Sequence, residues 1–311
     1  MSLAALGLAL GTCAMVAVAQ WPVYEVPAAP RNDDGSIDLE APAPVGLDGH
    51  PDLSGVWEPK RQAFGGANAK GKGGPPPPFA KGKGKGGFKG RGKSKANLPK
   101  RGVGEPGLAN FADLNNVYQE GIPYTDWALK VKEGRMANNS KDNPDAHCMP
   151  LGLMQLHTHP YEKKIVQSPS TMVIMYDANN DVRQILTDGR EPVELTEDLA
   201  PWFYGYSVGH WEDDTLVVET VGFRDDVWLD VNGSPLTHTG KLTERFKRLN
   251  YGTLQIDVTI EDPKAYTEPF TVRVLQQLLP DGELFESVCE DRDAGHYLGD
   301  AEIAADNPEQ E

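Results

Sequence analysis

Hydrophobic and polar positions between about Ile165 and Cys289 fall into short runs, each of which ends at a turn signal. β-Branched and aromatic residues fill the runs, whereas Asp, Asn, Gly and Pro separate them. This pattern predicts about nine strands. The runs are Lys163–Gln167, Thr171–Tyr176, Val182–Leu186, Tyr204–Trp211, Thr215–Thr220, Lys241–Arg248, Thr253–Ile260, Phe270–Leu278 and Leu284–Cys289.

The clearest alternation lies in Thr253–Ile260, where every second residue is apolar. A period of two with one apolar face predicts a strand with one packed side and one wet side. Connections this short favour antiparallel neighbours, and closure of the sheet removes exposed edges. We therefore predict an all-β fold: an antiparallel meander that closes into a lipocalin-like barrel, with a sandwich as second choice. Asn115–Met136 is the best helical stretch before it.

The first residues predict export. The apolar stretch from Leu3 to Ala19 is shorter than the roughly 20 residues that a membrane span needs. It ends in Ala17-Val18-Ala19, a small-x-small cleavage pattern, although no Lys or Arg precedes it. We expect a signal peptide, no transmembrane span, and a periplasmic or extracellular location; the alternative is a buried N-terminal helix.

The net charge of −16 is unevenly distributed. The segment from Pro59 to Gly104 contains 13 Lys or Arg and no acidic residue, so the rest of the chain carries −29. Its Gly-, Lys- and Pro-rich composition cannot bury enough apolar surface to offset the entropy of ordering, which predicts disorder. Its partner would be an anionic polymer, or else the segment is a tolerated insertion. We expect no nucleic acid partner for an exported chain.

These features divide the chain into six parts. They are a signal peptide (1–19), an N-terminal arm with the first strand (20–58), the basic insertion (59–104), a helix and loop segment that packs on the barrel (105–150), the barrel domain (151–298) and an acidic tail (299–311).

Several motifs together resemble one family of exported bacterial proteins. The motifs are Pro51–Trp57 (PDLSGVW), Cys148–Gly152 (CMPLG), Thr187–Arg190 (TDGR), Gly205–Glu212 (GYSVGHWE) and Asp262–Thr267 (DPKAYT). The resemblance spans about Asp48 to Leu298, without the basic insertion, which departs from the family pattern. The family carries no assigned activity, so the resemblance implies export and a single domain and transfers no catalytic residue.

His157 and His159 form the sharpest local feature. On a strand, residues i and i+2 share a face, so both imidazoles would reach one divalent metal such as zinc, copper or iron. A third ligand would come from His210, His238 or a carboxylate, and His210 is the candidate that we favour. The alternative is two rim histidines that bind backbone groups and no metal.

The segment around Trp202, Tyr204 and Tyr206 is the candidate ligand site, together with Trp211. Aromatic rings provide a wall for a sugar ring or an apolar ligand, although they serve equally well as core fillers. Arg190 could clamp a carboxylate or phosphate, or it could pin its own loop by pairing with Asp188 or Glu191.

Glu219 and Glu244 lie within predicted strands. Facing inward, they would need partners and could act as an acid–base pair; facing outward, they would be ordinary solvated residues, which we favour slightly.

Two functions follow from these candidates. The first is an exported barrel that binds a small amphipathic or sugar-like ligand in an aromatic-lined cavity. The alternative is a secreted metal-dependent or His-dependent hydrolase or lyase centred on His157 and His159, with Arg190, Glu219 and Glu244 as further catalytic candidates.

Removal of residues 1–19 leaves two cysteines, Cys148 and Cys289, which predicts a disulfide in an oxidising compartment. The alternative is two buried free thiols. A thiol titration of the denatured mature protein should find no thiol before reduction and two after it. Two thiols without reductant would contradict the disulfide and would weaken the prediction of export.

Overall fold

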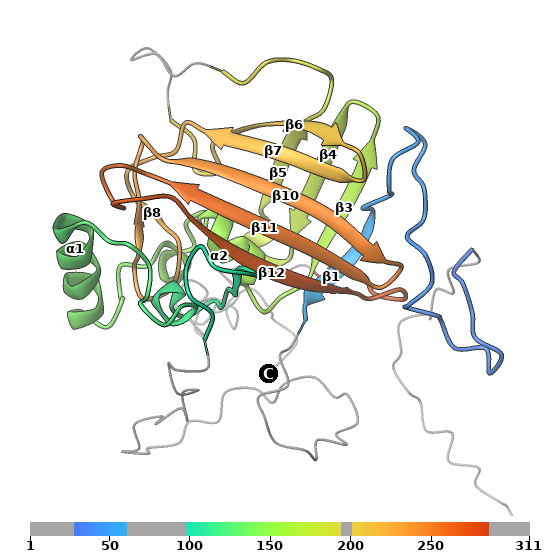
Figure 1. The fold of residues 1–311 in the computed structure, drawn as a ribbon, viewed down its shortest axis with the longest axis horizontal. Coiled ribbons are helices and arrows are strands. Elements are labelled where there is room, and N and C mark those ends of the chain that lie inside the picture. The colour runs from blue at the N-terminus through green and yellow to red at the C-terminus, as the bar shows by residue number, and fades with distance from the viewer. Residues whose placement is uncertain (1–27, 61–97, 194–200, 286–311) are drawn as a thin grey trace, which may run out of the picture.

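The protein folds around a closed β-barrel (Figure 1). The computed structural model describes residues 28–60, 98–193 and 201–285. Nine strands pair in the order β1-β3-β4-β5-β6-β7-β10-β11-β12, and β12 pairs back with β1. Their bounds are β1 Gly55–Pro59, β3 Lys163–Ser168, β4 Thr171–Tyr176, β5 Val182–Leu186, β6 Tyr206–Glu212, β7 Thr215–Val221, β10 Lys241–Asn250, β11 Thr253–Glu261 and β12 Phe270–Leu278. The predicted all-β barrel is therefore confirmed.

Closure depends on β1, which joins the two ends of the sheet. Trp57 is the register partner of Lys163 in β3 and of Leu278 in β12, and both pairings are antiparallel. The short β2 (Gly107–Leu108) adds to the other end of β12 in parallel. The predicted strand Leu284–Cys289 lies mostly outside the described residues, so β1 supplies the ninth strand of the barrel.

The period-two pattern places one face of each strand in the core. In β11, every second residue from Leu254 to Ile260 is at most 1% exposed, as the alternation predicted. Burial of each such aliphatic side chain stabilises the fold by about 1.5–3 kcal/mol relative to exposure. Strand β6 begins at Tyr206 and not at Tyr204, because Gly205 has a positive φ of +64°, which is not strand geometry. Glycine is needed there, since a Cβ would lie 2.7 Å from the Val221 carbonyl oxygen.

One strand pair departs from the predicted antiparallel meander. β5 and β6 are parallel, with Ile185 opposite Ser207 and Leu186 opposite Val208. The connection from 187 to 205 is long enough to return to the starting end of the barrel, which a parallel pair requires. The meander prediction is corrected at this junction.

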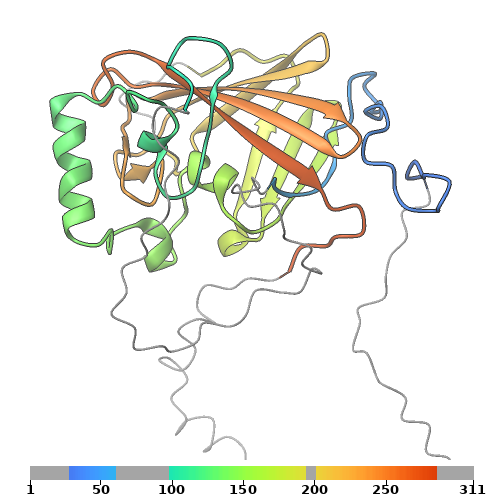
Figure 2. The same ribbon diagram turned by 60° about the horizontal axis from the view of Figure 1, so that its bottom comes forward.

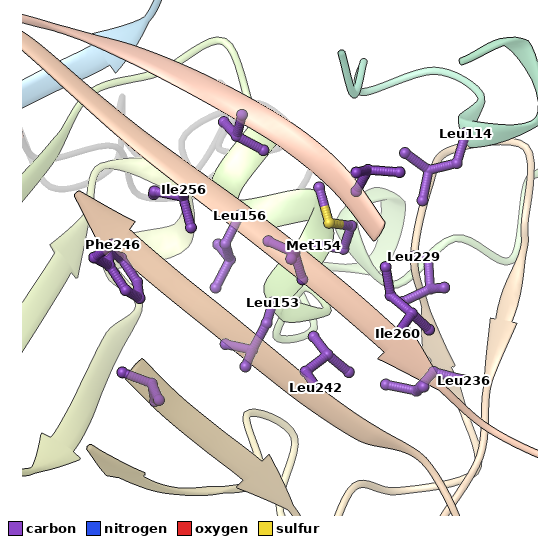
Figure 3. Packing of buried hydrophobic residues seen from close by; sticks show 14 of the residues in the cluster. Leu114, Leu153, Met154, Leu156, Leu229, Leu236, Leu242, Phe246, Ile256 and Ile260 are labelled. Atoms are coloured by element: carbon purple, nitrogen blue, oxygen red, sulfur yellow. The ribbon is translucent and has the colours of Figure 1, made fainter. Parts of the chain in front are cut away.

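A short helix, α2 (Leu153–Thr158), lies inside the barrel domain, and its last turn includes His157, for which the metal-site hypothesis assumed a strand. All six of its residues are buried. Leu153 and Leu156 pack among residues of β10 and β11 (Figure 3). Leu, Met and Gln are good helix formers, and the carbonyl oxygen of Trp228 would lie 2.4 Å from a Cβ at Gly152, so glycine permits this close approach.

The two ends of the barrel are covered by different segments (Figures 1 and 2). The arm before β1 contacts the hairpin end, where Tyr251 donates its N–H to Ala41 and the His50 ring stacks on Trp211 at 4.5 Å. Helix α1 (Asp126–Ala137), capped by Thr125, lies at the opposite end. The remaining elements are η2 Leu114–Asn116, η3 Pro144–His147, η4 Ala178–Asn180, β8 Val227–Trp228 and β9 Pro235–Leu236.

Leu156 tests whether α2 is part of the core. Leu156→Ala should lower the free energy of unfolding by about 2–5 kcal/mol, because the side chain is 0% exposed and its loss leaves a cavity. Leu129→Ala on α1, where leucine is 41% exposed, is the matched control and should cost much less. Equal midpoints of denaturant unfolding for the two variants would contradict this packing.

Candidate functional site

The two predicted metal-binding histidines lie at the end of α2 and do not share a face. Successive helical residues turn by about 100°, so residues i and i+2 point in nearly opposite directions. The His157 ring enters the barrel interior, whereas the His159 ring contacts Phe111 at 4.9 Å and Tyr161 at 4.7 Å. The strand geometry assumed for this pair was wrong.

His210, the expected third ligand, lies on the outer face of β6. Its side chain is 60% exposed and its Nε2 lies 3.4 Å from Glu212. Within the described residues, no group of three or more His, Cys, Asp or Glu side chains is arranged to hold a metal ion. The geometry gives no support to a zinc, copper or iron site built from these three imidazoles.

The interior instead contains an ionic cluster centred on Glu244 of β10. Its carboxylate is 0% exposed and accepts bonds from two sides. His157 Nε2 lies 2.6 Å from Oε1, while Arg183 Nη1 donates to Oε1 at 2.8 Å and Nη2 donates to Oε2. The outward orientation that we favoured for Glu244 was therefore wrong.

Arg183 connects this carboxylate to two hydroxyl groups on neighbouring strands. Its Nε and Nη2 donate to Ser207 Oγ at 3.2 and 3.0 Å, and Nη2 also donates to Thr220 Oγ1 at 3.0 Å. Arg183 was not among the predicted site residues. Its position two residues before buried Ile185 was the available signal, because alternate residues of a strand share a face.

A second set of bonds holds the end of α2. The His157 carbonyl oxygen accepts from Lys163 Nζ at 3.0 Å and from Gln276 Nε2 at 2.8 Å. Both donors are buried and come from opposite neighbours of β1, namely β3 and β12. Carbonyl groups at the end of a helix lack an intrahelical partner, so without these donors the buried His157 carbonyl would have no hydrogen bond.

Burial and charge shift the titration of these groups in different directions. Burial would raise the pKa of Glu244, but the Arg183 charge and the hydrogen bonds from Arg183 and His157 outweigh it and hold this pKa at about 2. Burial lowers the pKa of His157 despite the nearby Glu244 carboxylate, and it lowers the pKa of Lys163 to about 7. The cluster at neutral pH thus pairs an ionised Glu244–Arg183 couple with a neutral imidazole.

Access limits what this cluster does chemically. A histidine oriented by a carboxylate is a common acid–base arrangement, yet His157 and Glu244 are both 0% exposed. Two surface cavities, of about 240 and about 60 Å³, are lined by other residues. The cluster therefore acts as a structural clamp on α2 in this conformation.

Glu219 does not form a carboxylate pair with Glu244. In the β7–β10 ladder Glu244 stands opposite Val218, and Glu219 stands opposite Thr243, so the two carboxylates point to opposite faces. Glu219 binds Lys241 at 3.0 Å on the outer surface. The predicted outward orientation holds for Glu219, and the proposed acid–base pair is excluded.

Three of the predicted ligand-binding residues do lie together on the surface. The Trp202 and Tyr206 rings are 5.6 Å apart, and Trp202 is 38% exposed. Arg190 donates from Nη1 to the Tyr206 hydroxyl at 2.8 Å and from Nη2 to Asp188 at 2.6 Å. We call Trp202, Tyr206, Arg190 and Asp188 the aromatic platform. Arg190 therefore fixes its own loop by pairing with Asp188, which was one of the two predicted roles.

Tyr204 and Trp211 lie apart from this platform. Tyr204 is half-buried, and burial raises the pKa of its hydroxyl, with Asp181 acting in the same direction. Trp211 stacks on His50, a residue of the arm that contacts the hairpin end of the barrel. The four predicted aromatics therefore do not form one wall of a cavity.

Several predicted features fall on residues that the structure does not describe. The signal peptide, nearly all of the basic insertion and the acidic tail lie outside the described residues, as does Cys289. Cys148 follows η3 with φ +54°. The disulfide, the location and the anionic-polymer partner stay predictions.

Comparisons with known proteins identified no relative of the chain. No protein-family model matches the chain, and neither the curated proteins nor the solved structures contain a match to it. The family resemblance of the motifs stays a prediction. Among the described residues, no helix is long and apolar enough to cross a membrane.

Lys163 gives the interior a measurable pH dependence. The folded protein loses the Lys163 proton near pH 7, whereas the unfolded chain retains it up to the ordinary value of 10.5. The unfolded state therefore binds more protons between these values, and the free energy of unfolding should rise from pH 7 to pH 9 by up to about 2 kcal/mol from this group. Lys163→Met should remove that rise in denaturant titrations; an unchanged slope would contradict a neutral buried lysine.

Proposed function

We propose that the protein is exported and binds a small amphipathic or sugar-like ligand on the aromatic platform, with the barrel as a rigid scaffold. One observation carries the proposal. Arg190 is bonded both to Asp188 and to the Tyr206 hydroxyl beside the exposed Trp202 ring. An exposed aromatic face next to fixed polar groups is the arrangement that sugar rings and amphipathic ligands require.

The platform is organised before any ligand arrives. Arg190 donates through Nε, Nη1 and Nη2, so the guanidinium plane is fixed from two directions. A guanidinium has five N–H groups, and these bonds leave part of the fork for a ligand. Preorganisation of this kind reduces the entropy lost on binding.

The site proposed here differs from an aromatic-lined cavity. Helix α2 fills the end of the barrel interior with Leu153, Met154 and Leu156, all at most 1% exposed. A ligand site in that space would require displacement of the helix. The outer surface near the β5–β6 connection needs no such change.

The alternative is a hydrolase or lyase that uses His157 with Glu244. One observation supports it: His157 Nδ1 has no hydrogen-bond partner among the described residues, so this nitrogen is free to accept a proton. It ranks second because both side chains are 0% exposed.

Export is supported by the apolar stretch from Leu3 to Ala19 and by its Ala-Val-Ala end. The pair of cysteines that remains after cleavage agrees with an oxidising compartment.

Trp202→Ala tests the platform directly. The variant should weaken binding of a sugar ligand by about tenfold or more, which corresponds to about 1.4 kcal/mol of lost contact. Trp127→Ala on α1 is the matched control, because Trp127 is 42% exposed and lies on a different surface. Calorimetric titration against an oligosaccharide panel measures both variants. Equal affinities would place the ligand elsewhere, and no binding to unmodified protein would end the proposal.

A further inference from the structure

A second pair of arginine and aromatic side chains lies on the chain segments that adjoin Trp202. The Arg224 guanidinium lies over the Phe203 ring at 4.4 Å from its centroid. Its Nε and Nη2 donate to Asp226 at 3.0 and 3.2 Å. This unit repeats the chemistry of Arg190, which also pairs with an aspartate two residues away in the chain.

Backbone hydrogen bonds join the two units. Trp202 donates its N–H to the Gly222 carbonyl at 2.9 Å, and Arg224 donates its N–H to the Trp202 carbonyl at 3.2 Å. Trp202 also forms a bridge with Phe223 in parallel orientation. The segment that carries Trp202 and Phe203 is thus attached directly to the segment that carries Arg224.

Charge decides which class of ligand this surface suits. Each guanidinium is matched by one carboxylate, Arg190 by Asp188 and Arg224 by Asp226, so the four groups sum to zero. The whole chain carries −16, which disfavours the approach of an anion. An acidic ligand would therefore compete with the aspartates for guanidiniums that are already neutralised.

A neutral sugar makes better use of the same groups. An arginine beside an aspartate presents N–H donors next to carboxylate acceptors, and adjacent hydroxyls of a sugar both donate and accept. The apolar face of a sugar ring packs on an aromatic side chain, and Trp202 provides an exposed one. Each element of the surface thus has a counterpart on an uncharged saccharide.

We infer that the platform, extended by Arg224, Asp226 and Phe203, selects neutral saccharides over acidic ones. This inference rests on the proposed function, because it names the ligand class of the same site. The two Arg–Asp pairs act as donor–acceptor groups for neighbouring hydroxyls, and Trp202 supplies the stacking face.

The test uses three defined probes in calorimetric titrations of the full protein at low salt. Cellotriose and maltotriose represent neutral saccharides, and trigalacturonate represents an acidic one. At least one neutral probe should bind at least tenfold more tightly than trigalacturonate. Trp202→Ala should weaken the binding of the neutral probe about tenfold or more by removing the stacking face.

Two substitutions test the charge argument separately. Asp226→Asn frees a positive charge, so the affinity for trigalacturonate should rise several-fold while the affinity for the neutral probe falls. Asp142→Asn is the matched control, because it removes the same charge from an exposed Lys141–Asp142 pair in another loop. Arg224→Lys keeps the charge but loses the planar fork, so it should weaken the neutral probe.

The results distinguish failure of this inference from failure of the proposed function. Tighter binding of trigalacturonate than of either neutral probe, weakened in Trp202→Ala, would overturn the inference and leave the proposed function standing. An Asp226→Asn variant that behaves like Asp142→Asn would also overturn it. Binding of no probe, or binding that Trp202→Ala leaves unchanged, would end both.

Discussion

The structure depends on one buried ionic interaction, the Glu244–Arg183 pair with His157 attached to it. Two charges in a dry interior are costly unless every oxygen and N–H finds a partner, and loss of one partner typically costs about 3–5 kcal/mol. Ser207 and Thr220 complete this requirement on the arginine side. The cluster thus connects four barrel strands with α2, and it includes the parallel β5–β6 junction, where the antiparallel ladder is interrupted.

This constraint determines where function can reside. The cluster holds α2 in place, together with the bonds that Lys163 and Gln276 donate to the His157 carbonyl oxygen, so side chains fill the end of the barrel. The arm around His50 and the helix α1 cover the two ends from outside (Figure 1). The ligand site that we propose therefore lies on the outer surface, where Trp202 is exposed next to fixed polar groups and binding needs no rearrangement.

The interior and the surface use charge in different ways. Inside, Arg183 neutralises Glu244 because an isolated carboxylate could not stay ionised there. Outside, Arg190 and Arg224 pair with Asp188 and Asp226 although water would solvate each of them alone. Surface ion pairs contribute little stability, so positioning of the guanidinium planes is the physical effect that these pairs supply.

Much of the fold was determined by the sequence alone. Period-two alternation, as in Thr253–Ile260, located the strands, because side chains of a strand alternate between faces wherever one face is buried. The inward position of Arg183 was also within reach of that pattern. The tertiary structure alone decided that residues 153–158 form a helix inside the barrel, since a short apolar run suits either a buried strand or a buried helix. It alone brought His157 to Glu244, 87 positions away in the chain, because local patterns carry no information about which distant strand faces which.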